Sequence, residues 1–164
     1  QEQRAARMRE QERTRVRETA QLDALKSLLL AGVLVSKYST RGRKQPRKLF
    51  CDPSFQQLHW QEAAKEAFDY GRTRKGTVTG IKISDILEVL DGVQTKVLKA
   101  SVKKATDGQQ FLSLVTAERS VDLEIADPSL HKQLVDGFKL LVRTLRAGQR
   151  IKSAVRLSLA QNIA

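Results

Sequence analysis

A run of basic side chains between Ser36 and Asp52 is the part of the sequence best suited to do chemistry. It reads SKYSTRGRKQPRKLFCD and contains no carboxylate before its last residue. Its cations are Lys37, Arg41, Arg43, Lys44, Arg47 and Lys48. Because lysine and arginine donate charge-assisted hydrogen bonds to phosphate and carboxylate groups, the run predicts an anion-binding surface.

The whole chain shares this positive charge. Its 164 residues hold 30 Lys+Arg against 18 Asp+Glu, a formal net charge of +12. Such an excess predicts an acidic partner, which can be nucleic acid, anionic lipid or an acidic protein. No apolar run approaches the roughly 18 residues that a membrane-spanning helix needs. The single cysteine, Cys51, cannot form an internal disulfide and is expected in the core.

The sequence offers little for catalysis or metal binding. His59 and His131 have no cysteine or second histidine at metal-ligand spacing. The carboxylates Asp85, Glu88 and Asp91 lie close together, where turns and helix caps account for them. GRTRKGTV has two glycines but lacks the Lys-Ser/Thr pair of a phosphate-binding P-loop. We therefore expect a binding module with no cofactor and no metal, and not an enzyme.

The elements that must position the basic run follow from composition and periodicity. Residues 1–30 contain good helix formers and no Gly or Pro, and their leucines recur at helical spacing only near the end. A charged helix with a solvated N-terminal half is expected. From Gly32 the hydrophobic period becomes two, which predicts seven short strands, antiparallel because their connections are short. The strands are GVLVSKY, KLFCD, FQQLHW, GTVTGIKI, TKVLKASVKK, QFLSLVT and SVDLEIA.

A single helix is expected to close the strand region. Asp127 and Pro128 are a helix N-cap and a proline at the first helical position. One apolar stripe follows, made of Leu130, Leu134, Phe138, Leu141 and Leu145. The basic, amphipathic tail of residues 147–164 can lie in the plane of a membrane or dock back on the domain or on the N-terminal helix. Docking is favoured because the apolar face is Ala-rich and only modestly hydrophobic.

Helix, seven strands and helix is the order of a pleckstrin-homology domain, and several local motifs resemble that family. They are AGVLVSK, RKLF and LHWQE for the first three strands, ISDILEVLDG for the fourth strand and its turn, and QQFLSLVTAERSVDLEIAD for strands six and seven. The resemblance implies a mostly β fold, a seven-stranded barrel or sandwich capped by a C-terminal α-helix and preceded by a long N-terminal helix. The implied division is 1–30 for the charged helix, 31–146 for the pleckstrin-homology domain and 147–164 for the tail.

The charged helix in front and the basic tail behind resemble the acylated pleckstrin-homology proteins of apicomplexan parasites. In that family a myristoylated and palmitoylated N-terminal peptide anchors the protein on a secretory-organelle membrane, and the domain binds phosphatidic acid to license exocytosis. The resemblance therefore implies a peripheral protein on the cytoplasmic face of such an organelle. Any acylation peptide would lie upstream of Gln1.

Two positions depart from the pattern of phosphoinositide-binding members. Those members carry a Lys at the end of strand one and a K/R-x-R pair in strand two. Here the first position is Ser36, with Lys37 shifted by one, and the pair reads Arg47-Lys48-Leu49 and loses its second cation. Because strand side chains alternate faces, Lys48 cannot replace that cation. Selectivity for polyphosphoinositides is expected to be weak, whereas attraction to the simpler phosphomonoester of phosphatidic acid remains.

The predicted lipid-binding residues lie in the first two loops and the strands beside them, which rim one open end of the barrel in this fold. They are Lys37, Arg41, Arg43, Lys44, Arg47, Lys48, Lys65, Arg72, Arg74 and Lys75. Lys37, Arg47 and Lys65 are expected to converge on one phosphate. Phe68 and Tyr70 are expected either to enter the membrane interface or to pack within their loop.

Two other functions use the same features. A pleckstrin-homology domain can also bind phosphoinositides or dock a protein on a strand edge and the last helix. A basic strand surface can hold single-stranded nucleic acid, but the basic loops contain no Phe or Trp interleaved with the cations for base stacking. An anionic membrane lipid is therefore the expected partner, and nucleic acid is not.

Overall fold

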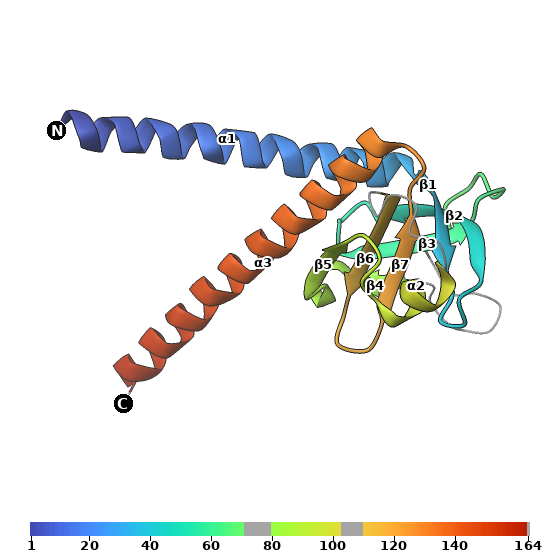
Figure 1. Cartoon of the computed structure of the whole chain (residues 1–164). Helices are drawn as coiled ribbons and strands as arrows, with labels where there is room; N and C mark the ends of the chain where they lie inside the picture. The colour runs from blue at the N-terminus through green and yellow to red at the C-terminus, as the bar shows by residue number, and fades with distance from the viewer. Residues whose placement is uncertain (71–79, 103–109, 164) are drawn as a thin grey trace.

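The computed structural model describes residues 1–70, 80–102 and 110–163 and is shown in Figure 1. The elements are α1 (Glu2–Ala31), β1 (Val33–Tyr38), β2 (Lys44–Cys51), β3 (Gln57–Glu62), β4 (Gly80–Lys82), the 3-10 helix η1 (Ile83–Asp85), β5 (Glu88–Asp91), α2 (Lys96–Ser101), β6 (Phe111–Val115), β7 (Ser120–Glu124) and α3 (Pro128–Ile163). All seven strands form one antiparallel sheet in the order β4-β3-β2-β1-β7-β6-β5. The expected seven-stranded sheet with a long helix before it and a helix after it is confirmed.

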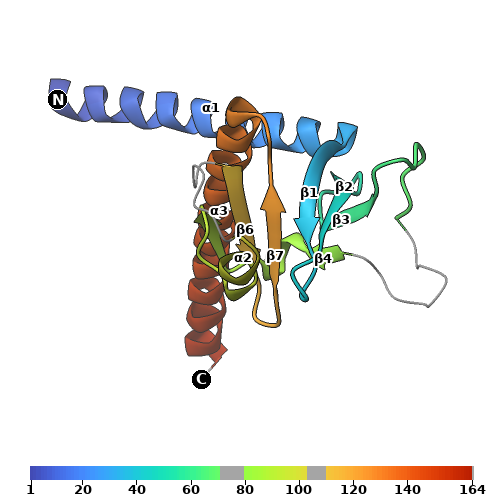
Figure 2. The ribbon, with the colours of Figure 1, turned by 45° about the vertical axis from the view of Figure 1, so that its right-hand side comes forward.

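Strand pairing determines which connections share an end of the sheet. Tyr38 lies opposite Lys44 in the β1–β2 pair and opposite Asp122 in the β1–β7 pair, while Val115 lies opposite Ser120 in the β6–β7 pair. The β1–β2 connection and the β6–β7 turn therefore leave the sheet on the same side, which is the lower edge in Figures 1 and 2. We call this side, with residues 39–43 and 116–119, the open end.

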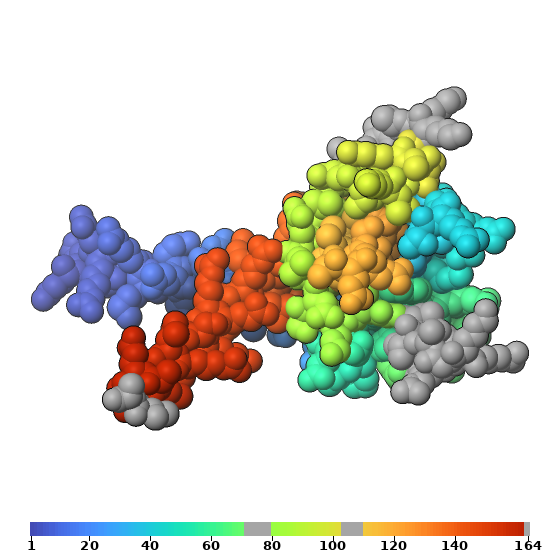
Figure 3. Space-filling view, turned by 90° about the horizontal axis from the view of Figure 1, so that it is seen from below, coloured from blue at the N-terminus to red at the C-terminus, as the bar shows by residue number. Residues whose placement is uncertain are grey.

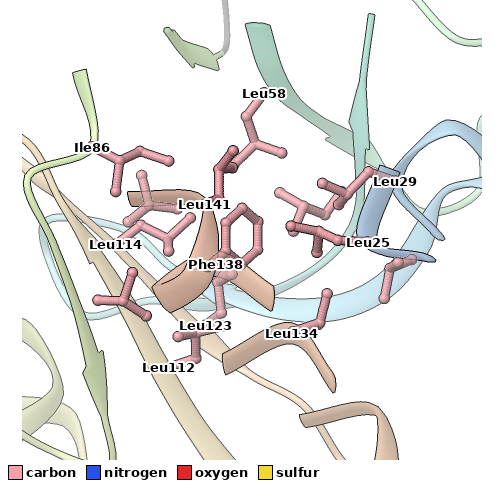
Figure 4. Packing of buried hydrophobic residues seen from close by; sticks show 14 of the residues in the cluster. Leu25, Leu29, Leu58, Ile86, Leu112, Leu114, Leu123, Leu134, Phe138 and Leu141 are labelled. Atoms are coloured by element: carbon pink, nitrogen blue, oxygen red, sulfur yellow. The ribbon is translucent and has the colours of Figure 1, made fainter. Parts of the chain in front are cut away.

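The opposite end of the barrel is closed by two helices. Leu25 and Leu29 of α1 and Leu134 and Phe138 of α3 are at most 2% exposed and pack against leucines of the strands (Figure 4). Fully burying one such side chain contributes about 1.5–3 kcal/mol, so the end of α1 is firmly docked. The helices approach closely because Gly137 has no side chain: a Cβ there would lie 3.2 Å from Leu25.

One expected strand is wrong. Lys96–Ser101, from the segment TKVLKASVKK, forms the short helix α2, and the fifth strand is instead Glu88–Asp91 within ISDILEVLDG. The Thr95 side chain accepts a hydrogen bond from the backbone N–H of Leu98 and so caps α2. Leu98 is buried against the outer face of the sheet, where tertiary contact overrides the β propensity of the neighbouring valines.

The expected docking of the C-terminal tail is also wrong. The helix α3 begins at Pro128, as predicted, with Asp127 accepting a hydrogen bond from the backbone N–H of Ser129. It then continues without a break to Ile163 and projects away from the barrel (Figure 1). Residues 149–162 are all exposed. Among the described residues, no helix is long and apolar enough to cross a membrane.

Candidate functional site

Lys37 faces the interior of the barrel at the open end. Strand alternation puts it on the same face as Val33 and Val35, and its side chain is only 8% exposed. Its Nζ lies 4.8 Å from the ring centroid of Trp60 on β3, at cation–π distance. Ser36, by contrast, lies on the outward face. The one-residue shift expected from the sequence therefore does not remove this lysine from the interior, because β1 continues in regular alternation to Tyr38.

A second cation, Arg119, meets the same tryptophan from the β6–β7 turn. Its Cζ lies 5.3 Å from the Trp60 ring centroid. The turn is held by hydrogen bonds between Thr116 and Arg119, from the Thr116 N–H to the Arg119 carbonyl at 2.8 Å and from the Arg119 N–H to the Thr116 hydroxyl at 3.2 Å. Arg119 lies between the predicted strands QFLSLVT and SVDLEIA, and no local pattern marks it as a partner of Trp60.

Arg47 adds a third positive charge from β2. It shares a strand face with Leu49, which is fully buried in the core. Its guanidinium donates to the Gln45 side-chain oxygen at 2.8 Å and to the Pro46 carbonyl at 2.9 Å, which holds the group in place. Since Leu49 fills core space, the strand has no second inward cation at that position. We call Lys37, Arg47, Arg119 and Trp60 the basic pocket, a name for these four side chains and not for a measured cavity.

The electrostatics of the basic pocket reflect crowded cations. The pKa of Lys37 is lowered to about 8. Burial is the largest cause, the charges of Arg119 and Arg47 also lower it, and the charge of Asp122 opposes the shift. Each of these effects except that of Asp122 penalises the protonated lysine. An anion placed among the three cations would relieve that penalty, so the arrangement is suited to bind one.

The β1–β2 connection carries two exposed arginines to the rim of the open end. Gly42 has a positive φ of 82° and donates its N–H to the Ser39 carbonyl at 2.8 Å, while the Ser39 N–H donates to the Arg43 carbonyl at 2.9 Å. This tight turn presents Arg41 and Arg43 to solvent. Both are therefore free to meet an anionic surface.

Lys44 is different from the two arginines because it already has a partner. Its Nζ lies 2.5 Å from Glu124, and this hydrogen-bonded ion pair raises the pKa of Lys44. The Tyr38 hydroxyl donates to the same carboxylate at 3.2 Å. Much of the charge of Lys44 is thus neutralised within the domain.

Lys48 lies on the outer face of the barrel, away from the basic pocket, and contacts the backbone of Lys65. The Lys48 Nζ donates to the Lys65 carbonyl at 3.0 Å and lies 5.7 Å from the Phe68 ring centroid. Phe68 stacks on the buried Phe50, with ring centroids 4.6 Å apart, and Tyr70 packs edge-on against Phe50 at 5.6 Å. Phe68 and Tyr70 thus contact the barrel at Phe50, and Tyr70 remains 43% exposed. Among the described residues, the hydrogen bonds of Lys65 go to Lys48, Gln61 and Glu62, and none joins it to Lys37 or Arg47.

The remaining sequence-predicted residues and sites add little. Arg72, Arg74 and Lys75 lie outside the described residues. Within residues 1–70, 80–102 and 110–163, no three side chains are grouped to hold a metal ion. A cavity of about 810 Å³ lies beside the β6–β7 turn, but its walls carry Asp52, Asp85 and Glu118 as well as Lys82 and Arg119. Because these walls carry charges of both signs, the cavity is less suited to bind an anion than the basic pocket is.

Comparisons with known proteins give similar folds. No protein-family model and no curated protein sequence matches the chain. Sub-compartment protein 3 of the inner membrane complex from Toxoplasma gondii aligns at a TM-score of 0.52 and 15% identity, over 77% of this chain and 86% of that one. The PH domain of TgAPH from Toxoplasma aligns at 0.48 and 12%, over 76% and 90%. The N-terminal PH domain of human ARAP2 aligns at 0.45 and 16%, over 69% and 78%. At such identities the first alignment supports a shared fold and nothing finer.

Proposed function

We propose, from the pleckstrin-homology fold that the chain adopts, that it is a peripheral membrane-binding module for anionic lipid, with phosphatidic acid as its preferred headgroup. Pleckstrin-homology domains as a class are lipid- or protein-binding modules and are generally not enzymes. The finer claim rests on the basic pocket and on the rim arginines. A phosphate in the pocket and neighbouring lipids at the rim would be bound together.

The observation that carries the proposal is the burial of Lys37 beside two other cations. Burying a charged group is costly, and Lys37 is 8% exposed with a pKa lowered to about 8, mainly by that burial, which the Asp122 charge offsets only in part. A domain selected for stability alone would place an apolar side chain there. The cost is explained when the three cations stabilise a phosphate, since charge-assisted hydrogen bonds to phosphate are among the strongest in proteins.

The buried Leu49 is the reason to prefer a phosphomonoester over a polyphosphoinositide. An inositol ring with several phosphates needs separate cations for each of them, and the inward position after Arg47 carries core leucine instead. Phosphatidic acid presents one phosphate at the bilayer surface, with a second ionisation near neutral pH for phosphomonoesters generally. Lys37, Arg47 and Arg119 suffice for one such group.

The cellular setting follows from the family resemblance of the sequence. Acyl chains upstream of Gln1 would tether the protein to the cytoplasmic face of a secretory organelle, and a single myristoyl chain gives only marginal, reversible binding. A basic surface that recognises phosphatidic acid would then be the second signal. In this proposal the protein senses phosphatidic acid during regulated exocytosis.

Liposome co-sedimentation tests the proposal. Vesicles of phosphatidylcholine are mixed with phosphatidic acid, phosphatidylserine or a phosphoinositide at matched surface charge. We expect the 164-residue chain to prefer phosphatidic acid, and we expect Lys37→Met and Arg47→Gln to remove that preference. Lys132→Gln is the matched control, because it removes one exposed charge from the start of α3 and leaves the open end intact.

Two results would overturn the proposal. One is equal sedimentation with phosphatidic acid and phosphatidylserine at every ionic strength. The other is strong competition by one isomer of a soluble inositol trisphosphate, which would show a stereospecific site for a polyphosphorylated ring instead.

A further inference from the structure

The end of α3 exposes apolar side chains that nothing in the described structure covers. Ile151, Val155 and Leu159 are 66%, 53% and 57% exposed, and Leu157 is 66% exposed. Residues four apart lie on one side of a helix, so Ile151, Val155 and Leu159 form a single apolar stripe. We call residues 149–162 the C-terminal arm. At 1.5 Å per residue the arm is roughly 20 Å long.

The charges of the C-terminal arm all have one sign. Arg150, Lys152 and Arg156 flank the stripe, and the sequence contains no carboxylate after Asp136. A free helix of this length is only marginally stable in water, so a surface that binds both the stripe and the cations would also stabilise the helix. A surface that binds the arm must therefore offer an apolar layer to the stripe and anionic groups to the cations.

Another helix of this same chain fits these features poorly. A second copy of the arm would bring its own cations against those of the first, since both copies lack carboxylates there. The N-terminal half of α1 carries more arginines than glutamates, so it offers little net attraction either. Figure 1 shows α1 and α3 diverging from their crossing near the barrel. An anionic bilayer surface, with headgroups above acyl chains, satisfies both the charge and the apolar stripe.

The arm also reaches the side of the molecule where the basic pocket opens. In Figures 1 and 2 the C-terminus lies below the β1–β2 connection and the β6–β7 turn, on the side of the open end. Figure 3 views the molecule from that side and shows the turn, the connection and the arm together. One membrane plane can therefore meet the open end and the tip of the arm at the same time.

We infer that the C-terminal arm is a second membrane contact, which inserts the Ile151, Val155 and Leu159 stripe among the headgroups of an anionic bilayer while the open end binds lipid phosphate. The inference rests on the proposed membrane function. In this inference the arm prolongs the time that the protein stays on the membrane but does not select a headgroup. Three flexible cations beside an apolar stripe have no fixed geometry for one headgroup.

The test compares two sets of exposed apolar residues. The variant Ile151→Gln, Val155→Gln, Leu159→Gln removes the stripe and keeps a good helix former at each position. The control Met8→Gln, Val16→Gln changes residues of α1 with matched exposure, 62% and 59%. On vesicles containing phosphatidic acid or phosphatidylglycerol, we expect the first variant to bind about tenfold more weakly to both, and the control to bind like the unmodified chain.

A fluorescent label gives a second, direct readout. Cys51 is fully buried and burial raises its pKa to about 11, so a thiol-reactive, environment-sensitive dye will label an introduced cysteine instead. With Leu159→Cys, emission should shift to the blue on anionic vesicles. With Val16→Cys it should not shift.

The outcomes separate this inference from the proposed function. If the unmodified chain fails to bind any anionic vesicle, both are overturned. If it binds but the triple variant binds equally well and the label at position 159 does not shift, only the arm contact is overturned. Self-association abolished by the triple variant without vesicles, or binding of an oligonucleotide that depends on the stripe, would show a different occupant and overturn it as well.

Discussion

The open end of the barrel and the C-terminal arm are both basic, yet the sheet and the helix hold their cations in opposite ways. At the open end Lys37 is 8% exposed, and it and Arg119 lie over the Trp60 ring. In the arm, Ile151 is 66% exposed, and Arg150, Lys152 and Arg156 project from a helix that contacts nothing else in the described structure. Fixed donors can distinguish one headgroup from another, whereas a free basic helix responds to surface charge and apolar depth.

We therefore expect the open end to select the lipid headgroup and the arm to prolong membrane binding. Lys37, buried on a strand, incurs a desolvation cost when no ligand is bound, and a ligand of the right charge offsets it. Cations on an exposed helix incur no such cost, and their attraction to a bilayer falls with salt. Changes in the two regions should therefore alter different properties of membrane binding.

The largest effect is expected from the rim of the open end. Reversing both Arg41 and Arg43 to Glu lowers the net charge of this rim by four units. Each basic residue near an anionic leaflet contributes about 1 kcal/mol to binding. We expect binding to acidic vesicles to fall by about a hundredfold at low salt, measured by co-sedimentation. Lys44→Gln alone should weaken binding less than Arg43→Gln, because the Lys44 ammonium is held at the Glu124 carboxylate and is not available to a lipid headgroup. Equal effects of the two single changes would contradict this assignment.

Next in size is the loss of selectivity at the basic pocket. Lys37→Met should weaken binding to phosphatidic acid about tenfold while changing binding to phosphatidylglycerol much less, because a charge-assisted bond is worth about 1.5–3 kcal/mol. The triple change in the arm should weaken both lipids alike.

The Lys37→Met variant also tests whether Lys37 has a structural role. Replacing a buried, desolvated lysine with Met should raise the melting temperature, which can be followed by circular dichroism. A variant that is less stable and equally impaired on both lipids would instead indicate a structural role for Lys37.

A smaller effect is expected from pH. With a pKa of about 8, Lys37 is mostly charged at pH 7 and mostly neutral at pH 9. Affinity for phosphatidylglycerol vesicles, whose charge is constant in this range, should fall about twofold between these values. Folding stability should change in the opposite direction, because between pH 8 and 10.5 the unfolded chain retains a proton that the folded chain has released. Lys37→Met should show neither change, and titration of vesicle binding and of thermal unfolding measures both.

The smallest effect concerns the junction between the domain and the arm. Gly148 lies where contact with the barrel ends, and a Cβ there would meet nothing within 4 Å. Glycine weakens a helix interior by roughly 0.5–1 kcal/mol relative to alanine, so it is the easiest point at which α3 can bend to lay the arm on a membrane. We expect Gly148→Ala to raise helix content slightly and to reduce the blue shift of a label at position 159 about twofold. A larger blue shift would show that a straight arm inserts better.

Much of the architecture was determined by the sequence alone, because local rules decide it. The period-two runs from Gly32, the Asp127-Pro128 helix start and the leucines near the end of the first helix all correspond to observed elements. Composition also predicted an anion as partner. Where local signals conflicted, as in TKVLKASVKK, the prediction was wrong, since a threonine cap and the burial of Leu98 outweighed the β-branched residues.

The membership of the basic pocket was decided only by the tertiary structure. Lys37 and Arg119 are far apart in sequence and meet at Trp60 because β7 pairs with β1 and the β6–β7 turn folds over the same end of the barrel. The backbone carbonyl of Lys65, a residue predicted to converge with Lys37, instead accepts a hydrogen bond from Lys48 on the outer face. Long-range strand pairing sets which faces converge, and this information is spread over the whole chain and absent from any local segment. The exposure of the C-terminal arm also depends on the tertiary structure, because the buried residues of α3 end at Val142.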